Sequence, residues 1–263
     1  MDLGLKGRRA LVMGASKGLG RSIADALAAE GATLAISGRD QASLDRAAAE
    51  LRAAGAAAAT GIVADVAQGE QMDRLADAAV AAMGGVDILV LNHGGPPPCI
   101  ASEITDASLH TWFEQIVASP IRIANRLVPA MRKQGFGRVI VVGSTGMQHP
   151  IPNLALSNTL RAAIWGWLKT YSGEAARDGV TMNVLAPGSI MTDRIVQNAT
   201  SRAAKAGTTA ESEMARMSDE IPAGRIGTPD EYGPMGAFLA SDRAAYITGS
   251  MIRVDGGRVR SML

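Results

Sequence analysis

A glycine-rich stretch near the N-terminus has the residue types and the spacing that bind a phosphate group. It follows a short apolar run and precedes a helical pattern. Its residues are Gly14, Ser16, Lys17, Gly18, Leu19 and Gly20. Glycines allow a sharp turn and a close approach of the backbone to an anion, and the N-terminus of a helix offers free N–H groups and a favourable dipole. We therefore predict that this stretch binds the pyrophosphate of a dinucleotide.

Basic residues near this stretch indicate which dinucleotide is bound. The second apolar run ends in Ser37-Gly38-Arg39-Asp40. A site for NAD usually has an acidic residue here for the ribose hydroxyls, whereas an arginine can bind a 2′-phosphate. Asp40 stands where the next helix needs an N-cap. Lys17 and Arg39 could each be a solvated surface charge, but together they favour NADP(H) over NAD(H).

Short apolar runs alternate with helical patterns along most of the chain, which is typical of a parallel sheet covered by helices. The expected strands are 9–13, 33–37, 58–64, 86–91, 138–143, 180–185 and 251–254. The expected helices are 19–30, 41–54, 70–83, 109–133 and 157–177. The sequence predicts an α/β fold: a single, doubly wound Rossmann domain over residues 1–263, with a seven-stranded parallel sheet flanked by helices on both faces.

One segment interrupts the alternation. Residues 192–227 are rich in Ala, Ser, Met and charged residues, and we expect helices outside the sheet that cover the substrate as a lid. The alanine-rich stretch 47–59 also looks unusual. Its spacing of Leu44 and Leu51, with Gly55 as a stop signal, predicts a packed helix rather than a linker.

Further motifs resemble those of the short-chain dehydrogenase/reductase (SDR) family, close to the branch of bacterial 3-oxoacyl-carrier-protein reductases. The resemblance covers nearly the whole chain, including the ending Val254-Asp-Gly-Gly257. It implies hydride transfer between NAD(P)H and a carbonyl or alcohol, and a homotetramer or homodimer. Besides the glycine-rich stretch, the positions that it implies for cofactor binding are Asp65, Val66, Asn92, Gly94, Pro187, Gly188, Ile190 and Thr192.

The catalytic positions depart from the family pattern. Ser144 matches the family serine, but Ser157 and Arg161 stand where Tyr and Lys are expected, and Ile116 stands at the position of a helix Asn. A serine hydroxyl is a far poorer acid than a tyrosine, whose reference pKa is about 10, and an arginine cannot relay a proton. Arg161 lies on the same helix face as Ser157, and it is expected to keep the contact with the nicotinamide ribose.

A histidine is the alternative proton donor. His149 follows Ser144 by five residues, and imidazole titrates near neutral pH. An ordinary exposed loop histidine remains the competing interpretation. His93 and Cys99 lie near the expected cleft, and we interpret them as a structural histidine and an ordinary thiol.

Composition limits the remaining function classes. A net charge of +1 does not favour nucleic acid, no run of 18 apolar residues is present, and no Cys/His cluster has metal-ligand spacing. A single cysteine fits a cytoplasmic protein. Two hypotheses stay open. One is an NADP(H)-dependent oxidoreductase acting on a carbonyl, an alcohol or an activated C=C bond. The other is a non-catalytic NADP(H)-binding protein, such as a sensor or an assembly subunit.

Overall fold

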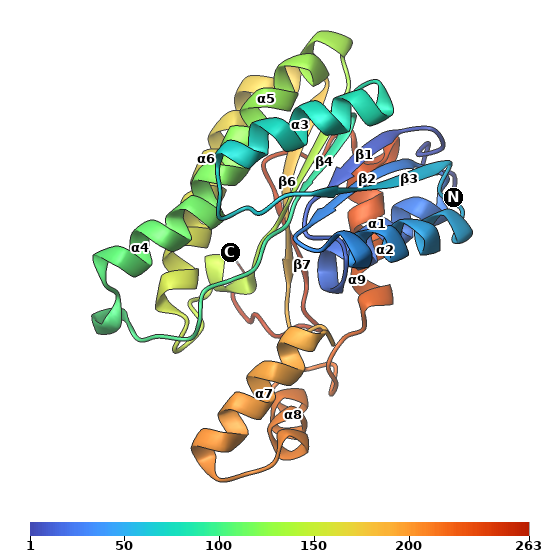
Figure 1. Ribbon diagram of the computed structural model, residues 1–263. Helices are drawn as coiled ribbons and strands as arrows, with labels where there is room; N and C mark the ends of the chain where they lie inside the picture. Colours follow the sequence, from blue (N-terminus) through green and yellow to red (C-terminus); the bar gives the residue numbers. More distant parts are fainter. Residues whose placement is uncertain (263) are drawn as a thin grey trace.

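A sheet of seven parallel strands lies between two layers of helices (Figure 1). The computed structural model describes residues 1–262, the side chain of Lys205 excepted. The strand order is β3-β2-β1-β4-β5-β6-β7. The strands are β1 (Arg9–Val12), β2 (Thr33–Gly38), β3 (Ala58–Val63), β4 (Ile88–Leu91), β5 (Gly137–Val142), β6 (Val180–Pro187) and β7 (Met251–Val254). The predicted doubly wound fold is confirmed.

Two hydrophobic cores hold the helices against the sheet. In β4, Leu89 and Leu91 belong to one core, and Ile88 and Val90 belong to the other. Every residue of this strand is buried, because successive side chains point to opposite faces and both faces are covered. The helices against the first face are α3 (Glu70–Met83), α5 (Ser119–Gln134) and α6 (Ala155–Ala175); those against the second are α1 (Gly18–Ala29), α2 (Gln41–Ala53) and α9 (Pro229–Ala240) (Figure 1).

The single helix expected over residues 109–133 is interrupted. The chain forms α4 (Asp106–Phe113), a π-helical turn over Glu114–Ala118, and then α5. The amide of Ser119 donates to the carbonyl of Glu114, five residues earlier. A π-turn has an i→i+5 hydrogen bond and is wider than an α-turn, but the chain stays helical through it. For this reason the sequence pattern did not show the break.

Helix α9 was not predicted, because its sequence contains Pro229, Gly233, Pro234 and Gly236. The glycines are required by close packing. A Cβ atom on Gly233 would collide with the backbone oxygen of Ser22 on α1, and one on Gly236 would lie 2.8 Å from Ile23. Helix α9 therefore crosses α1 at close range. The small residues are required by this packing and do not mark the end of a helix.

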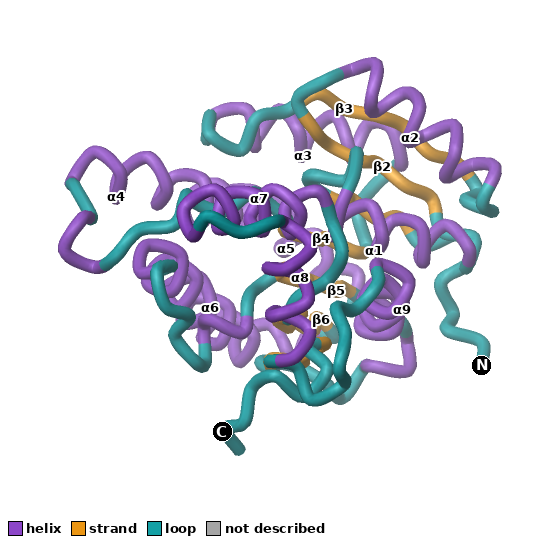
Figure 2. Tube along the Cα trace, turned by 90° about the horizontal axis from the view of Figure 1, so that it is seen from below, coloured by secondary structure: helices purple, strands orange, loops and turns teal. Residues whose placement is uncertain are grey.

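Two helices project beyond the carboxyl ends of the strands. They are α7 (Asp193–Ala206) and α8 (Ala210–Asp219), and they stand apart from both helix layers in Figure 1. In Figure 2, which shows the molecule from below, they are drawn in front of the strands. Their positions match the expectation of helices outside the sheet. Within residues 1–262, no helix is long and apolar enough to cross a membrane, and no three acidic, histidine or cysteine residues are grouped as a metal site.

Candidate functional site

The glycine-rich stretch forms a tight turn between β1 and α1. Gly14 has a φ of +57°, which favours glycine. A Cβ atom on Gly20 would lie only 2.6 Å from both the Gly14 oxygen and the Asn92 amide nitrogen. Asn92 Nδ2 donates to the carbonyl oxygens of Met13 and Gly14, at 3.2 and 3.1 Å. The side chain that follows β4 therefore holds the turn that follows β1.

The N-terminus of α1 has the properties of a phosphate site. Lys17 occupies the N-cap position, and its side chain makes no capping hydrogen bond to the first turn of the helix. The N–H groups at this helix end, unpaired within the helix, are therefore available to an anion. The turn thus fits the pyrophosphate of a dinucleotide, with Gly18 and Leu19 at the helix start and Ser16 just before it.

The basic residues near this turn are on the surface. Arg39 is exposed, and Lys17 Nζ pairs with Asp193 Oδ2 of α7 at 2.8 Å. Asp40 is the N-cap of α2, as expected, since its carboxylate accepts from the amide of Ser43 at 2.8 Å. Its hydrogen bonds to Ser43 lower the Asp40 pKa.

The other positions implied for the cofactor also follow strands, at the same edge of the sheet. Asp65 and Val66 follow β3. Asp65 accepts from the amide of Ala67 at 3.0 Å, and the Val66 oxygen accepts from Ser119 at 2.7 Å. Gly94 follows β4 and is exposed.

The segment after β6 joins this edge to α7. Pro187 is the last residue of β6, and the amide of Gly188 donates to Val254 of β7 at 2.9 Å. Ile190 pairs with Gly227. Thr192 is the N-cap residue of α7, and its methyl group lies 4.0 Å from the point where Gly18 would carry a Cβ atom. The glycine-rich turn and the start of α7 therefore face each other.

Ser157 and Arg161 are joined as the i,i+4 spacing on α6 predicts. Arg161 Nε donates to Ser157 Oγ at 3.3 Å. Arg161 Nη1 donates to the carbonyl oxygens of Val142 and Gly143, at 3.0 and 3.2 Å. Ser144 follows directly and is half-buried, and its Oγ accepts from the amide of Gly146 at 3.0 Å. Arg161 thus links the end of β5, next to Ser144, to Ser157.

Two titratable side chains near Arg161 are unsuited to proton donation. Burial, helped by the positive charge of Arg161, lowers the pKa of His93 to about 3, so its ring is neutral near pH 7. His93 Nε2 is buried without a hydrogen-bond partner among the described residues. Tyr232 is fully buried, its hydroxyl donates to the Leu185 oxygen at 3.0 Å, and burial raises its pKa.

The remaining predicted positions differ in exposure. His149 is exposed in the turn after Ser144, and its backbone amide donates to Thr145. Ile116 is fully buried within the π-turn. π-turns are often found at functional sites, but here the side chain at this position packs in the core.

Sequence reasoning did not find Arg194, on the first turn of α7. Its Nη1 and Nη2 donate to the carbonyl oxygens of Gly95 and Pro96, at 3.2 and 3.0 Å. Arg194 thereby ties α7 to the loop after β4. Arg194 and Arg161 are 33 positions apart, and no sequence pattern connects them.

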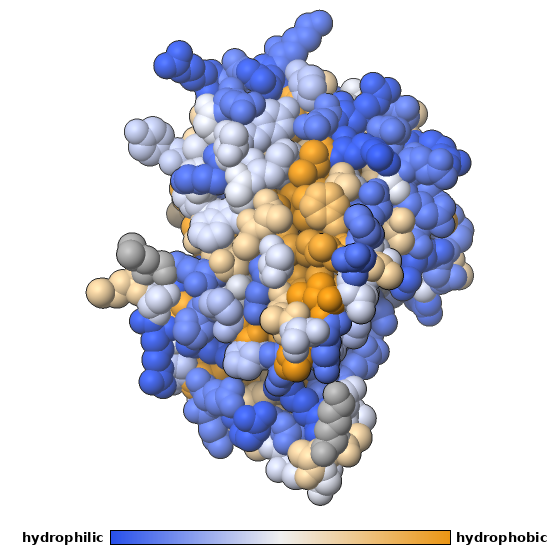
Figure 3. Space-filling model, turned by 90° about the vertical axis from the view of Figure 1, so that its left-hand side faces the viewer, coloured by the Kyte–Doolittle hydropathy of each residue, from blue (hydrophilic) through white to orange (hydrophobic). Residues whose placement is uncertain are grey.

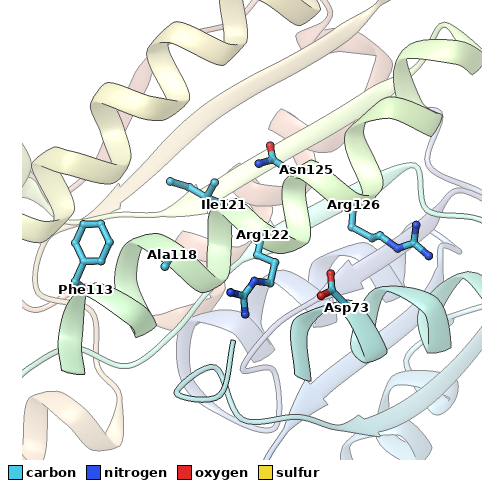
Figure 4. Close-up of a pocket in the computed structure, with 7 residues that line it drawn as sticks. All are labelled: Asp73, Phe113, Ala118, Ile121, Arg122, Asn125 and Arg126. Carbon is cyan, nitrogen blue, oxygen red and sulfur yellow. The ribbon is translucent and has the colours of Figure 1, made fainter. Parts of the chain in front are cut away.

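An open hollow of about 610 Å³ lies away from these residues, between α3 and the π-turn and α5 (Figure 4). Arg122 and Arg126 of α5 point toward α3, which carries Asp73 (Figure 4). An apolar strip runs over the side of the molecule seen in Figure 3. None of the predicted site residues lines this hollow, so its size is no argument for placing the reaction there.

Comparison with known proteins identifies the family. Residues 14–258 match the family model described as enoyl-(acyl carrier protein) reductase. Dehydrogenase/reductase SDR family member 4 of Sus scrofa is 34% identical over 256 residues, which cover 96% of this chain and 88% of that protein. The 3-oxoacyl-(acyl-carrier-protein) reductase of Escherichia coli is 33% identical over 255 residues, with 97% and 98% covered. The chain belongs to the short-chain dehydrogenase/reductase family of oxidoreductases, and it resembles the 3-oxoacyl-carrier-protein reductase branch.

A solved structure shows how far the fold similarity extends. L-sorbose reductase from Gluconobacter frateurii, solved with NADPH and L-sorbose, superposes with a TM-score of 0.94 at 31% identity, and both chains are covered completely. The coverage includes α7 and α8, so these helices belong to the shared architecture. Binding of a nicotinamide cofactor fits both this similarity and the geometry of the glycine-rich turn.

Proposed function

We propose that this protein is an NADP(H)-dependent oxidoreductase that acts on a carbonyl, an alcohol or an activated C=C bond. The observation that carries the proposal is the glycine-rich turn, in which Gly14, Gly20 and Asn92 leave the N-terminus of α1 open to a pyrophosphate. The same sheet edge presents Ser144, Ser157 and Arg161. This is a cofactor site next to polar groups that can hold a substrate oxygen.

The cofactor preference rests on Lys17 and Arg39. Both are basic, and both lie where a 2′-phosphate would reach the surface of the protein. Replacing Arg39 with Gln should bring the dissociation constants of NADPH and NADH closer, because charge-assisted hydrogen bonds to the phosphate are lost. Equal constants for the two cofactors in the unaltered protein would contradict the preference.

The reaction depends on how this chain's residues replace a strong acid. A bound nicotinamide cofactor supplies or accepts a hydride. Ser144 donates a hydrogen bond to the substrate oxygen, and the charge of Arg161 stabilises negative charge that develops there. Since no phenol occupies the position of Ser157, protonation of a ketone oxygen is weakly assisted. Reduction of an activated C=C bond needs less acid strength at the oxygen, and this chemistry suits the site best.

Helices α7 and α8, with the segment up to residue 227, are proposed to act as the lid. Closure of such a segment excludes water and completes the site. The two bonds from Arg194 to the loop after β4 are contacts of the kind that hold a lid closed.

The decisive test is NADPH oxidation with a panel of ketones, enones and enoyl thioesters. Turnover of enones or enoyl thioesters, with slow turnover of ketones, is the expected result. NADPH binding without turnover of any compound would favour the second candidate, a non-catalytic NADP(H)-binding protein. The absence of an available phenol beside Arg161 is the observation that keeps this candidate open.

We also propose a homodimer or homotetramer with residues 247–257 in a subunit interface. β7 is the edge strand, all four of its residues are half-buried, and the preceding Tyr246 is fully exposed. Covering an edge strand protects it from uncontrolled pairing. Sedimentation as a monomer at micromolar concentration would rule this out.

A further inference from the structure

The loop after β3 is tied to α5 by a buried serine. Ser119 is the first residue of α5, directly after the π-turn, and it is fully buried. Its Oγ donates to the carbonyl oxygen of Val66 at 2.7 Å, although the two residues are 53 positions apart. The hydroxyl and the carbonyl satisfy each other, so α5 holds the loop that carries Asp65 and Val66.

The π-turn aims the hydroxyl of Ser119 at this loop. The amide of Ser119 donates to the carbonyl of Glu114, and Oε1 of Glu114 lies 3.1 Å from Ser119 Oγ. Because the hydroxyl carries one proton, Glu114 and Val66 share it, and the shorter bond is the one to Val66. In an uninterrupted α-helix the amide of Ser119 would bond to residue 115, and its side chain would point in another direction. The double connection to Glu114 therefore fixes where the hydroxyl points.

Two charged side chains close over the end of the same loop. A Cβ atom on Gly69, the N-cap residue of α3, would collide with Nη1 of Arg122 and with Oε1 of Glu114. Arg122 follows Ser119 by three positions, so both lie on one face of α5, and Figure 4 shows Arg122 pointing toward α3. The loop is thus held at Val66 by a hydrogen bond and is covered at Gly69 by side chains of opposite charge.

The position of the loop assigns it to the adenosine half of the cofactor. β3 lies beside β2, on the side of β1 away from β4, β5 and Ser144. The amide of Ala64 donates to the carbonyl of Gly38 at 2.9 Å, so the loop begins next to Arg39. The pyrophosphate is proposed to lie at the N-terminus of α1, and the 2′-phosphate beside Arg39. The adenosine that carries this phosphate therefore belongs over β2 and β3, next to the loop.

We propose that Ser119, aimed by Glu114, is a positioning residue for the cofactor, and that its bond to Val66 holds the loop after β3 in the conformation that binds adenosine. The inference rests on the proposed NADP(H)-dependent function, to which it adds residues outside the glycine-rich turn. Without the bond, a smaller fraction of the molecules has a loop that is ready to bind. The apparent affinity for every ligand that contains the adenosine half falls with that fraction.

The test uses 2′,5′-ADP, the adenosine half of NADPH with its 2′-phosphate. Calorimetry measures the binding of 2′,5′-ADP and of NADPH to the unaltered protein and to the Ser119→Ala variant. Both affinities should fall by the same factor, about 3- to 10-fold, as expected when one hydrogen bond to a buried group is lost. Hydrogen exchange at the amides of residues 65–69 should become faster in the variant, and bound 2′,5′-ADP should slow it again.

Two further variants accompany this change. Ser172→Ala is the matched control, because Ser172 is also buried but its Oγ donates to the Lys169 oxygen within α6, at 2.8 Å. It should leave both affinities unchanged. Glu114→Ala removes the group that aims the hydroxyl and leaves Ser119 in place. This variant should weaken both ligands equally, by about 2- to 5-fold, and it provides the test if Ser119→Ala fails to fold.

The possible results separate the inference from the proposed function. A loss of NADPH affinity without a loss of 2′,5′-ADP affinity would overturn the inference, because the effect would then come from the nicotinamide half. Faster exchange throughout the sheet, instead of at residues 65–69, would contradict it as a general loss of stability. Unchanged binding of both ligands in folded variants would also overturn it and leave the proposed oxidoreductase standing. An unaltered protein that binds neither ligand would refute the proposed function, and the inference with it.

Discussion

The two halves of the candidate site differ in how their residues are held. Around β1, α1 and β4, backbone turns and one amide side chain, Asn92, define the geometry. Around β5, α6 and α7, long charged side chains define it. Arg161 and Arg194 reach across loops to carbonyl oxygens, and Ser157 and Arg161 stand where the sequence comparison leads us to expect Tyr and Lys. A cofactor site built from backbone tolerates little change, whereas a site built from side chains can acquire another chemistry on the same scaffold.

The strongest test of this contrast restores the expected residues in the second half. The double change Ser157→Tyr and Arg161→Lys should raise the rate of ketone reduction by about 10²–10⁴-fold, because that is the usual contribution of a positioned general acid. NADPH oxidation with a small ketone measures it. Ser157→Phe with Arg161→Lys is the matched control, since it supplies the ring without the hydroxyl. Similar rates in both double variants would show that α6 does not present this position to the substrate.

His149 is the competing candidate for the proton donor, and the same NADPH oxidation assay tests it. If it donates the proton in the unaltered protein, His149→Ala should abolish turnover while NADPH affinity stays nearly unchanged. Retained turnover in this variant would remove His149 from the mechanism.

The second test addresses the half that depends on backbone. Gly20→Val should weaken NADPH binding by about 10- to 100-fold, because overpacking costs about 1–3 kcal/mol and here displaces the Gly14 oxygen and Asn92. Fluorescence titration of NADPH measures the affinity, and thermal unfolding shows whether the variant is folded. Gly166→Val is the control, because a Cβ atom on Gly166 of α6 has no neighbour within 4 Å. Gly20→Ala serves as the milder change if the valine variant fails to fold.

The same division explains what the sequence could predict. The glycine-rich turn and the strands are local patterns, and their places follow from turn chemistry and periodicity. Asp40 was predicted as an N-cap for the same reason, and the structure confirms it. The contact of Arg161 and Arg194 with Gly95 depends on how α7 folds back onto the loop after β4, and no local sequence pattern predicts this contact. Helix α9 was missed because Gly233 and Gly236 serve a packing contact with α1 that lies about 210 positions away in sequence.

A third test concerns the acid stability of β1 and β4, the strands that carry the first half, at their amino ends opposite the candidate site. Asp87 accepts hydrogen bonds from the amide, Nε and Nη2 of Arg9 and from Gln134. Burial alone would raise the Asp87 pKa, but these bonds outweigh it and lower the pKa below its ordinary value of 3.8.

Because the folded-state pKa of Asp87 is the lower one, the stabilisation is complete above the unfolded-state value and is lost as the pH falls through the folded-state value. Asp87→Asn should cost about 1–3 kcal/mol at pH 7 and make unfolding less pH-dependent below pH 4. Urea unfolding from pH 2 to 7 measures both. Asp77→Asn, which removes an exposed ion pair with Arg126, should change little. If the unfolding free energy of the Asp87→Asn variant fell at low pH as steeply as that of the unaltered protein, the role assigned to Asp87 in acid stability would be contradicted.

The smallest expected effect lies at the contact between the two halves. Lys17 of the glycine-rich turn and Asp193 of α7 form an exposed ion pair, with side chains 72% and 66% exposed. Such a pair is worth about 0.2–1 kcal/mol and weakens with salt. Asp193→Asn should therefore raise hydrogen exchange of α7 amides about 5-fold at most, and less in high salt. Asp219→Asn on α8 is the control.

If Lys17 also binds the 2′-phosphate, NADPH competes with Asp193 for the same ammonium group. Saturating NADPH should then abolish the difference between Asp193→Asn and the unaltered protein, whereas NADH should leave it. A difference that persists equally with both cofactors would show that Lys17 serves α7 and not the phosphate.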